Sequence, residues 1–467
     1  MSGFSSLNVA TSALAAQQRA MDVTGQNIAN ASTAGYTRQR VDMQAVSGVS
    51  AATYYTRSDG LGNGVSADTV TRVRDAFLER RAQQEAGTAA QATAVATAYD
   101  GVETSFGEPG TTGLQKLMST TSAAWSSLST GTGATSTAKR ETVLKSAQNV
   151  AAALNSASGQ LDAQWSNTRT SVADTLTEAN AAITQIADLN RAIGAQVSTG
   201  LSANELMDQR DALVKTLATS VGATAVEIGN GMVNVVVGNT TVVGGTSSMQ
   251  LVLGGATDPS AMSSTPVTLT AAPGGGASLV VGGSIGGQLT AMNSIIPGYK
   301  ATLDTVAASL VTSTNAALTA GYDQSGAAGT ALYGGTTAAT ISVLITDPTK
   351  LAAAGSAPSS GNASTDGTVA DTIAQLSTST SGPDASYRTM ITELGVKSRS
   401  ATAAVTAATA IVTQVEASRQ SVSGVSLDEE MTNMLIFKQS YSAAARLVTA
   451  VDEMLDVLIN KTGLVGR

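Results

Sequence analysis

The residues that could carry chemistry in this chain are few, because the sequence contains neither histidine nor cysteine. Without histidine there can be no Ser–His–Asp triad, no imidazole general base and no zinc site of the His-Glu-x-x-His kind. Without cysteine there can be no disulfide framework and no thiolate nucleophile or ligand. Lys350 and several aspartates in the region 323–385 leave a Ser/Lys or carboxylate mechanism open, but their spacing brings no such set together.

Two other patterns resemble ligand sites and are better explained as structure. Asp208 and Asp211 lie one helical turn apart, but Arg210 stands beside them and no second acidic cluster completes a metal site. We interpret them as residues of a helix surface. The glycine-rich pieces 274–276 and 282–287 match neither the P-loop nor the dinucleotide-binding spacing, and turns between strands explain them. The sequence therefore predicts no catalytic, cofactor-binding or metal-ligating residue, and no cofactor.

Composition narrows the class of protein further. The 467 residues are enough for two to four domains, and only 13% are charged, with a formal net charge of −8. Such an acidic chain is repelled by nucleic acid and by anionic membranes, so neither is an expected partner. Aromatic residues make up 3%, so the small apolar side chains favour helix packing over a ligand pocket, and no small-molecule substrate is expected. Residues 1–20 lack the pattern of a cleavable secretory signal, and no apolar run approaches the roughly 20 residues that span a bilayer.

Both ends of the chain carry the seven-residue repeat of a coiled-coil seam. Ser426 followed by Glu429 is a capping box that starts the C-terminal helix, and Asn30 and Gly35 offer left-handed positions that end the N-terminal one. The repeats predict an assembly interface at Leu7, Leu14, Met21, Ile28, Leu427, Met434, Phe437, Tyr441, Ala444, Val448, Val451, Leu455 and Leu458.

The middle of the chain combines long helices with two less helical inserts. Predicted helices are Lys139–Ile193, Asn204–Ser220, Ile285–Ala320 with a kink at Pro297, and Tyr387–Val422. Strands are predicted within Ala225–Val281, where Gly238-Asn239 forms a two-residue hairpin turn. The second insert, Asp323–Pro383, is rich in Gly, Ser, Thr and Ala and has a short apolar run at Ile341–Ile345. The charged residues between Asp68 and Glu85 are interpreted as a solvated helix face with local ion pairs, and the alternative is a contact between subunits.

The predicted fold class is mainly α with β inserts, an α+β multidomain chain. It would contain terminal helices paired as a coiled coil, a bundle of long helices and small β-rich outer domains. The expected segments are 1–60 and 425–467 for the terminal coiled coil, 61–222, 284–322 and 386–424 for the helical stalk, 223–283 for the β-rich insert and 323–385 for the loop- and β-rich second insert.

Several motifs resemble those of flagellar axial proteins. The family motif residues near the start are Asn27, Asn30, Gly35, Tyr36 and Arg38, which resemble the N-terminal signature shared by flagellar rod, hook and hook-associated proteins. The segment from Val422 to Arg467 is similar, more specifically, to the hook-associated proteins of the FlgK family. Interior segments that resemble the same family, in the same order, are Phe106 to Pro109, Gly113-Leu114, Met207 to Asp211, Pro297 to Tyr299 and Gly321 to Asp323.

The resemblance implies a structural subunit that joins hook to filament and is not an enzyme. It implies export by the flagellar type III apparatus without signal cleavage, and an extracellular place in the flagellum. The implied partners are copies of the chain in a ring, the hook protein, a second junction protein or the flagellin side, and an export chaperone. Alternatives are a hook or distal rod protein, and a secreted axial scaffold with an enzymatic or adhesive insert. Because isolated helices are marginal in water, we expect the terminal helices to become well ordered only on assembly.

Overall fold

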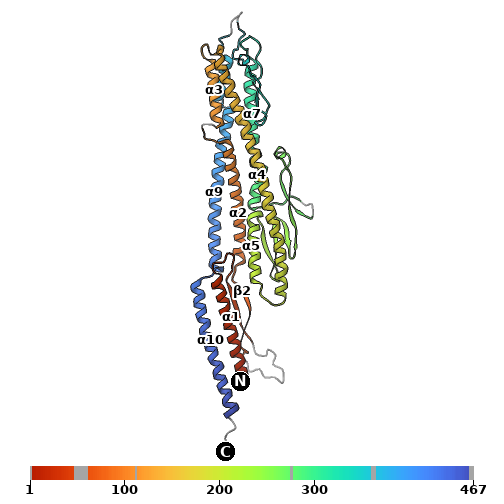
Figure 1. The fold of residues 1–467 in the computed structure, drawn as a ribbon, viewed down its shortest axis with the longest axis vertical. Helices are drawn as coiled ribbons and strands as arrows, with labels where there is room; N and C mark the ends of the chain where they lie inside the picture. The colour runs from red at the N-terminus through yellow and green to blue at the C-terminus, as the bar shows by residue number, and fades with distance from the viewer. Residues whose placement is uncertain (1–2, 47–61, 111–112, 274–276, 359–363, 462–467) are drawn as a thin grey trace, which may run out of the picture.

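The protein is described by a computed structural model that covers residues 3–46, 62–110, 113–273, 277–358 and 364–461. It is elongated, and long helices run along its axis (Figure 1). Within the described ranges the helices are α1 Gly3–Asn30, α2 Ala76–Phe106, α3 Leu114–Ser129, α4 Thr137–Ser198, α5 Asn204–Val221, α6 Gly283–Thr290, α7 Ile296–Thr319, α8 Thr368–Gln375, α9 Pro383–Ser423 and α10 Leu427–Asp456.

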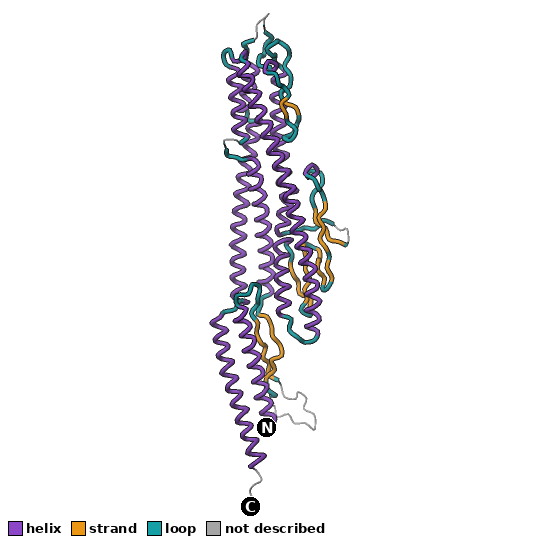
Figure 2. The backbone as a smooth tube through the Cα atoms, viewed as in Figure 1, coloured by secondary structure: helices purple, strands orange, loops and turns teal. Residues whose placement is uncertain are grey.

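The strands form small antiparallel sheets beside the helices (Figure 2). They are β1 Gln39–Ala45, β2 Val65–Arg72, β3 Thr224–Gly229, β4 Met232–Val237, β5 Thr240–Gly244, β6 Ser247–Ser248, β7 Gln250–Gly254, β8 Thr268–Ala272, β9 Tyr333–Gly334 and β10 Ser342–Val343. The prediction of a mainly α multidomain chain with β inserts is confirmed. No helix in the described part of the chain is both long and apolar enough to cross a membrane.

The longest element is α4, with 62 residues, which corresponds to about 90 Å. Its N-cap is Ser136, whose side chain accepts a hydrogen bond from the Lys139 amide, and no proline interrupts the helix. Its buried stripe includes Trp165, whose indole Nε1 donates to the Met292 carbonyl at 3.1 Å. The predicted helix at Lys139–Ile193 is confirmed and is a few residues longer at each end.

The helix predicted at Ile285–Ala320 is divided into two. A π-helical turn at Ala291–Ile295 separates α6 from α7, and Pro297 occupies the first turn of α7. Proline has no backbone N–H to donate to the carbonyl four residues earlier, and the helix accordingly widens into a π-helical turn just before Pro297.

The first insert packs its sheets against α4 through asparagine side chains. Asn190 donates to the carbonyls of Val233 and Gly245, both at 2.7 Å, and accepts from the Val233 amide at 3.2 Å. Asn180 pairs in the same way with the backbone of Leu251. The predicted hairpin turn at Gly238-Asn239 joins β4 to β5, with Gly238 at φ +56°.

The second insert is mostly loop, with the short pair β9–β10 and the helix α8, which the sequence analysis did not predict. The side chain of Asn155 on α4 donates to the Ala338 carbonyl at 2.6 Å. The buried Arg140 donates to the carbonyls of Ala134 and Leu351 and so fastens a loop to the start of α4.

One connected apolar core runs through the bundle and both inserts, and Trp125, Trp165 and Tyr387 are its largest fully buried apolar side chains. Among the described residues, no side chain of α1 or α10 belongs to this core. The terminal helix pair has its own small set of buried residues. The continuous apolar packing therefore ends where the bundle meets the terminal pair.

A β-hairpin that the sequence analysis did not predict lies beside α1 (Figure 2). Its strands β1 and β2 pair from Gln39 with Arg72 to Ala45 with Val65. They pair across the segment boundary expected at residue 60, and the residues nearest that boundary, 47–61, lie outside the described ranges. We therefore propose that the terminal domain extends to the end of β2.

Candidate assembly surface and its polar joint

The two terminal helices lie side by side and antiparallel, with both chain ends at the same end of the molecule (Figure 1). Helix α1 packs against α10 and against both strands of the hairpin, and its buried residues are mostly small, namely Ala10, Ala16, Ala20, Val23, Thr24 and Asn27. Small side chains let neighbouring elements approach a helix closely. The predicted stripe of Leu7, Leu14, Met21 and Ile28 is only half-buried.

Helix α10 buries little of its apolar surface. Of its residues only Glu430 and Val451 are buried. The predicted positions Met434, Phe437, Ala444, Val448 and Leu455 are half-buried, and Leu427, Tyr441 and Leu458 are exposed. On α10 and the π-helical turn Val457–Lys461 that follows it, large exposed apolar residues outside the predicted stripe are Met431, Leu435, Ile436, Leu447, Met454, Val457 and Ile459. The apolar surface therefore extends well beyond the heptad positions.

The family motif forms a buried cluster at the end of the helix pair that adjoins the bundle. The Asn27 amide nitrogen donates to the Gln39 carbonyl at 2.9 Å and to Glu430 Oε2 at 3.0 Å. Its amide oxygen accepts from the Tyr36 hydroxyl at 2.9 Å and from the Gln39 amide at 3.0 Å. Both donors and both acceptor positions of the Asn27 side chain are therefore used.

Glu430, in the first turn of α10, is the acidic partner of this cluster. Its Oε1 lies 2.7 Å from Arg38 Nε, and its side chain is 2% exposed. Arg38 also reaches Glu429 at 3.1 Å, and its amide donates to the Ser423 carbonyl at 3.0 Å. Burial, together with Asp208, Glu205 and Glu430, raises the pKa of Tyr36 to about 12, so its hydroxyl remains a donor at neutral pH.

Asn30 and Gly35 end α1 and turn the chain toward β1. The Asn30 side chain donates to the Gln26 carbonyl at 3.1 Å and accepts from the Thr33 hydroxyl at 3.3 Å. Gly35 has φ +83°, in the left-handed region that glycine adopts without a steric penalty. The turn brings Tyr36 and Arg38 back to Asn27 and Glu430.

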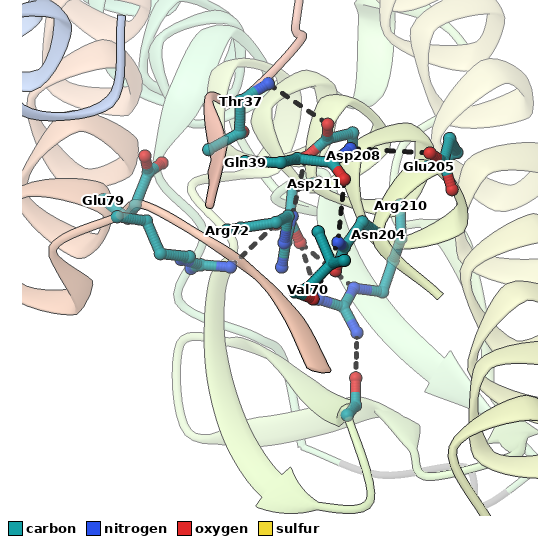
Figure 3. A network of polar contacts seen from close by, with 12 residues as sticks. Thr37, Gln39, Val70, Arg72, Glu79, Asn204, Glu205, Asp208, Arg210 and Asp211 are labelled. Atoms are coloured by element: carbon teal, nitrogen blue, oxygen red, sulfur yellow. Dashed lines mark hydrogen bonds and ion pairs between the residues drawn. The ribbon is translucent and has the colours of Figure 1, made fainter. Parts of the chain in front are cut away.

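A network of ion pairs connects the hairpin to α5 (Figure 3). We name it the polar joint and define it by Arg72, Arg74, Asp208, Arg210 and Asp211. Arg72 Nη1 lies 2.8 Å from Asp208 Oδ1 and 2.8 Å from Asp211 Oδ2. Asp211 also pairs with Arg74 at 2.9 Å and with Arg210 at 2.8 Å.

Backbone and amide groups extend the polar joint on both sides (Figure 3). The Thr37 amide donates to Asp208 Oδ2 at 3.1 Å, and Arg210 donates to the Gly231 carbonyl at 2.5 Å. The Asn204 amide group donates to Gln39 Oε1 and to the Val70 carbonyl, both at 3.0 Å. The joint thus ties the hairpin, α5 and the β3–β4 turn together.

The interpretation of Asp208, Arg210 and Asp211 as a helix surface is wrong. Arg210 is 1% exposed, and both aspartates pair with arginines from outside the helix, Arg72 of β2 and Arg74 just after it. Arg72 likewise belongs to a strand and not to a solvated helix face. Burial would raise the pKa of Asp211, but Arg210, Arg72 and Arg74 outweigh it and hold that pKa below its usual value.

A cleft of about 1070 Å³ lies next to the polar joint, between the turn 31–38, α5 and the end of α9. Its charged side chains are paired: Arg419 lies 2.7 Å from Glu416 and 3.4 Å from Glu79. Among the described residues, no group of three or more acidic side chains could hold a metal ion. The described polar groups hold parts of the chain together, and α10 carries more of the large exposed apolar residues than any other described element. These features define an elongated structural subunit whose C-terminal helix leaves many apolar side chains exposed.

Comparison with known proteins identifies the family. A family model described as the flagellar hook-associated protein FlgK helical domain matches residues 99–333, which is half of the chain. The chain belongs to this family of flagellar hook-associated proteins. Models described as the flagella basal body rod protein and the flagellar basal body rod FlgEFG protein C-terminal match residues 7–37 and 416–461.

Individual relatives agree with the family. Flagellar hook-associated protein 1 of Bacillus subtilis (strain 168) is 29% identical over 518 residues, which cover 100% of both chains. The protein of the same name from Escherichia coli (strain K12) is 25% identical over 565 residues, covering 97% of this chain and 99% of that one. The solved structure of the flagellar hook junction protein FlgK from Burkholderia pseudomallei has the same fold, with a TM-score of 0.62 and 17% identity over 73% of this chain and 100% of that chain. The chain is therefore a structural component of the flagellum.

Proposed function

We propose that this protein joins the flagellar hook to the filament, and that neighbouring subunits cover the exposed apolar surface of α1 and α10. The observation that carries the proposal is the exposure of α10. Leu435 is 65% exposed and Ile436 is 54% exposed, side by side on a helix that buries only two of its residues. Contiguous apolar surface of this kind is rare on monomeric proteins and marks an interaction site.

The arrangement of the chain supports assembly through its ends. Both termini lie at one end of the molecule, the second insert lies at the opposite end, and the first insert lies along the side of the bundle (Figure 1). Coverage of α10 would come from copies of the chain in a ring, with the hook protein on one side and a second junction protein or flagellin on the other. The residues proposed for this contact are the predicted stripe, together with the exposed neighbours Met431, Leu435 and Ile436.

The same proposal includes location and route. The subunit would stand in the extracellular part of the flagellum after export with a chaperone and without signal cleavage. We propose no catalytic role, because the family is structural and the ionisable side chains of the polar joint pair with one another.

The experiment places charge on the exposed apolar surface. In the parent bacterium, Leu435→Asp combined with Ile436→Asp is expected to leave hooks intact and to reduce filaments per cell at least tenfold, because each carboxylate would be desolvated in the contact. The matched control is Val252→Asp, an equally apolar and 45% exposed residue in the β-rich insert, which should leave filaments unchanged. Normal filament numbers in the double variant would contradict the proposal.

A further inference from the structure

An exposed aromatic residue, Phe77, precedes two arginines in the first turns of α2. Phe77 is 62% exposed, although the chain has only four phenylalanines. At 100° per residue, Phe77, Arg80 and Arg81 lie within about 100° of one another around the helix, and all three are exposed. Arg80 donates only to the Ala76 carbonyl, at 3.4 Å, and Arg81 lies 3.9 Å from Glu85, so neither has a close ion pair within the described ranges. We name Phe77, Arg80 and Arg81 the basic patch.

A second exposed patch, of opposite charge, occupies the first turn of α10. Leu427 is 51% exposed and Met431, one helical turn later, is 59% exposed. Asp428, which follows Leu427 in the sequence, is also exposed. No ion pair involves Asp428 in the described part of the chain. We name Leu427, Asp428 and Met431 the acidic patch.

The two patches lie at the same height along the molecule. The Arg38 amide donates to the Ser423 carbonyl at 3.0 Å, and the Arg38 carbonyl accepts from the Val73 amide at 2.8 Å. Helix α2 begins shortly after Val73, and α10 begins shortly after Ser423. One residue therefore fixes the start of both helices at the level of the polar joint.

The basic patch faces away from α9, and no ion pair joins it to the acidic patch within the described part of the chain. Glu79 points toward α9, because its carboxylate lies 3.4 Å from Arg419. Phe77 precedes Glu79 by two residues, so it lies about 200° around the helix and faces away from α9 and the link to α10.

We propose that the basic patch of one copy docks on the acidic patch of the next copy. The proposal rests on the proposed function, in which copies of the chain form a ring. Phe77 would lie between Leu427 and Met431, and the two guanidinium groups would pair with Asp428. Aromatic residues, methionine and arginine are the types enriched in protein interfaces, and sulfur packs well against aromatic rings. Because the patches differ, the contact is head-to-tail, which generates a ring when the rotation closes.

Cysteine cross-linking tests the contact, since the natural chain has no cysteine. The variant carrying Arg81→Cys and Asp428→Cys, as the only copy in the parent bacterium, should give disulfide-linked multiples of the 46.6 kDa chain after oxidation of isolated flagella. The matched pair Arg81→Cys with Thr177→Cys, an exposed position on α4, should remain monomeric. Filament-bearing flagella whose Arg81–Asp428 pair stays monomeric would overturn this contact while leaving the junction role intact.

Charge reversal provides a second test that does not depend on disulfide geometry. Arg80→Glu with Arg81→Glu should reduce filaments per cell at least fivefold, and adding Asp428→Arg should restore at least half of the loss. Filament numbers within twofold of the wild type in the Arg80→Glu, Arg81→Glu variant would overturn the contact.

Discussion

The single residues that matter most here are polar and buried. Asn27 connects α1, β1 and α10 through four hydrogen bonds, and one of them reaches Glu430, 403 positions away in sequence. A buried group that loses such a partner incurs its full desolvation cost, so each of these bonds is more important to stability than an exposed one. The motif residues therefore hold the two ends of the chain together.

Replacing Asn27 by aspartate should weaken the terminal helix pair. The substitution removes both donors and places a negative charge next to Glu430, which Asn27 contacts at 3.0 Å. We expect the stability of the terminal helix pair to fall by about 3 kcal/mol. The measurement is the temperature at which filaments detach from hooks, which should fall markedly. Asn8→Asp, at an exposed position of the same helix, is the control and should leave that temperature unchanged.

The polar joint should depend on pH in a defined direction. Because Arg210, Arg72 and Arg74 hold the pKa of Asp211 below its usual value of 3.8, the stability contributed by this carboxylate is complete above that value. It is lost as the pH falls through the lower pKa of the folded state. Asp211→Asn should therefore cost about 3 kcal/mol at pH 6, and this difference should shrink below pH 3.8.

Urea unfolding of the purified chain and of the Asp211→Asn variant, followed by circular dichroism from pH 6 to pH 3, measures this difference. Asp188→Asn is the control, because its partner Arg191 lies on the same exposed helix surface. A difference between wild type and Asp211→Asn that grows toward acid would contradict the assigned role.

Sequence alone identified Asn27, Tyr36 and Arg38 as motif residues but not what they bind. Their partners Glu430, Gln39 and Ser423 are brought close only by the antiparallel pairing of the termini and by the hairpin. The polar joint was not predicted, for the same reason. Asp208 and Arg72 are 136 residues apart, and each has local neighbours of opposite charge that suggest a simpler surface pairing.

At the scale of elements, the sequence predicted those with a single regular apolar stripe. Helix α4 has such a stripe, and the start of α10 was also marked by its capping box. Both helices are present. Helix α2 packs against α9, α6 and α5 on different faces, so its buried residues form no single stripe. Strands β1 and β2 lie beside α1 but bury few residues, so their sequence lacks the apolar alternation typical of strands.

The terminal helices should be less stable than the bundle in the free subunit. Together α1 and α10 bury few side chains, and these do not belong to the apolar core of the bundle. Helices that bury little apolar surface are marginal in water. Hydrogen exchange on the monomer should therefore show rapid exchange in α1 and α10 and strong protection near Trp165 in α4. Equal protection of α1, α10 and α4 in the monomer would contradict the prediction that the terminal helices are less stable than the bundle.

The whole molecule consists of a long bundle and a terminal helix pair that share no continuous apolar core within the described ranges. Polar contacts with defined geometry connect the two parts, through Arg38 at one side and the polar joint at the other. Directional contacts of this kind fix the angle at which the terminal pair leaves the bundle. The fold class and the family were predictable from composition, periodicity and motifs, whereas this connection was not, because every part of it depends on residues distant in sequence.

The most direct test of the junction role is deletion of residues 425–467 in the parent bacterium. Since this removes α10 and its exposed apolar surface, cells should still make hooks, carry no filaments and release flagellin into the medium. The full-length gene supplied in trans should restore filaments. Normal motility in the deletion strain, with filaments attached to their hooks, would contradict the claim that this helix joins the subunit to its neighbours.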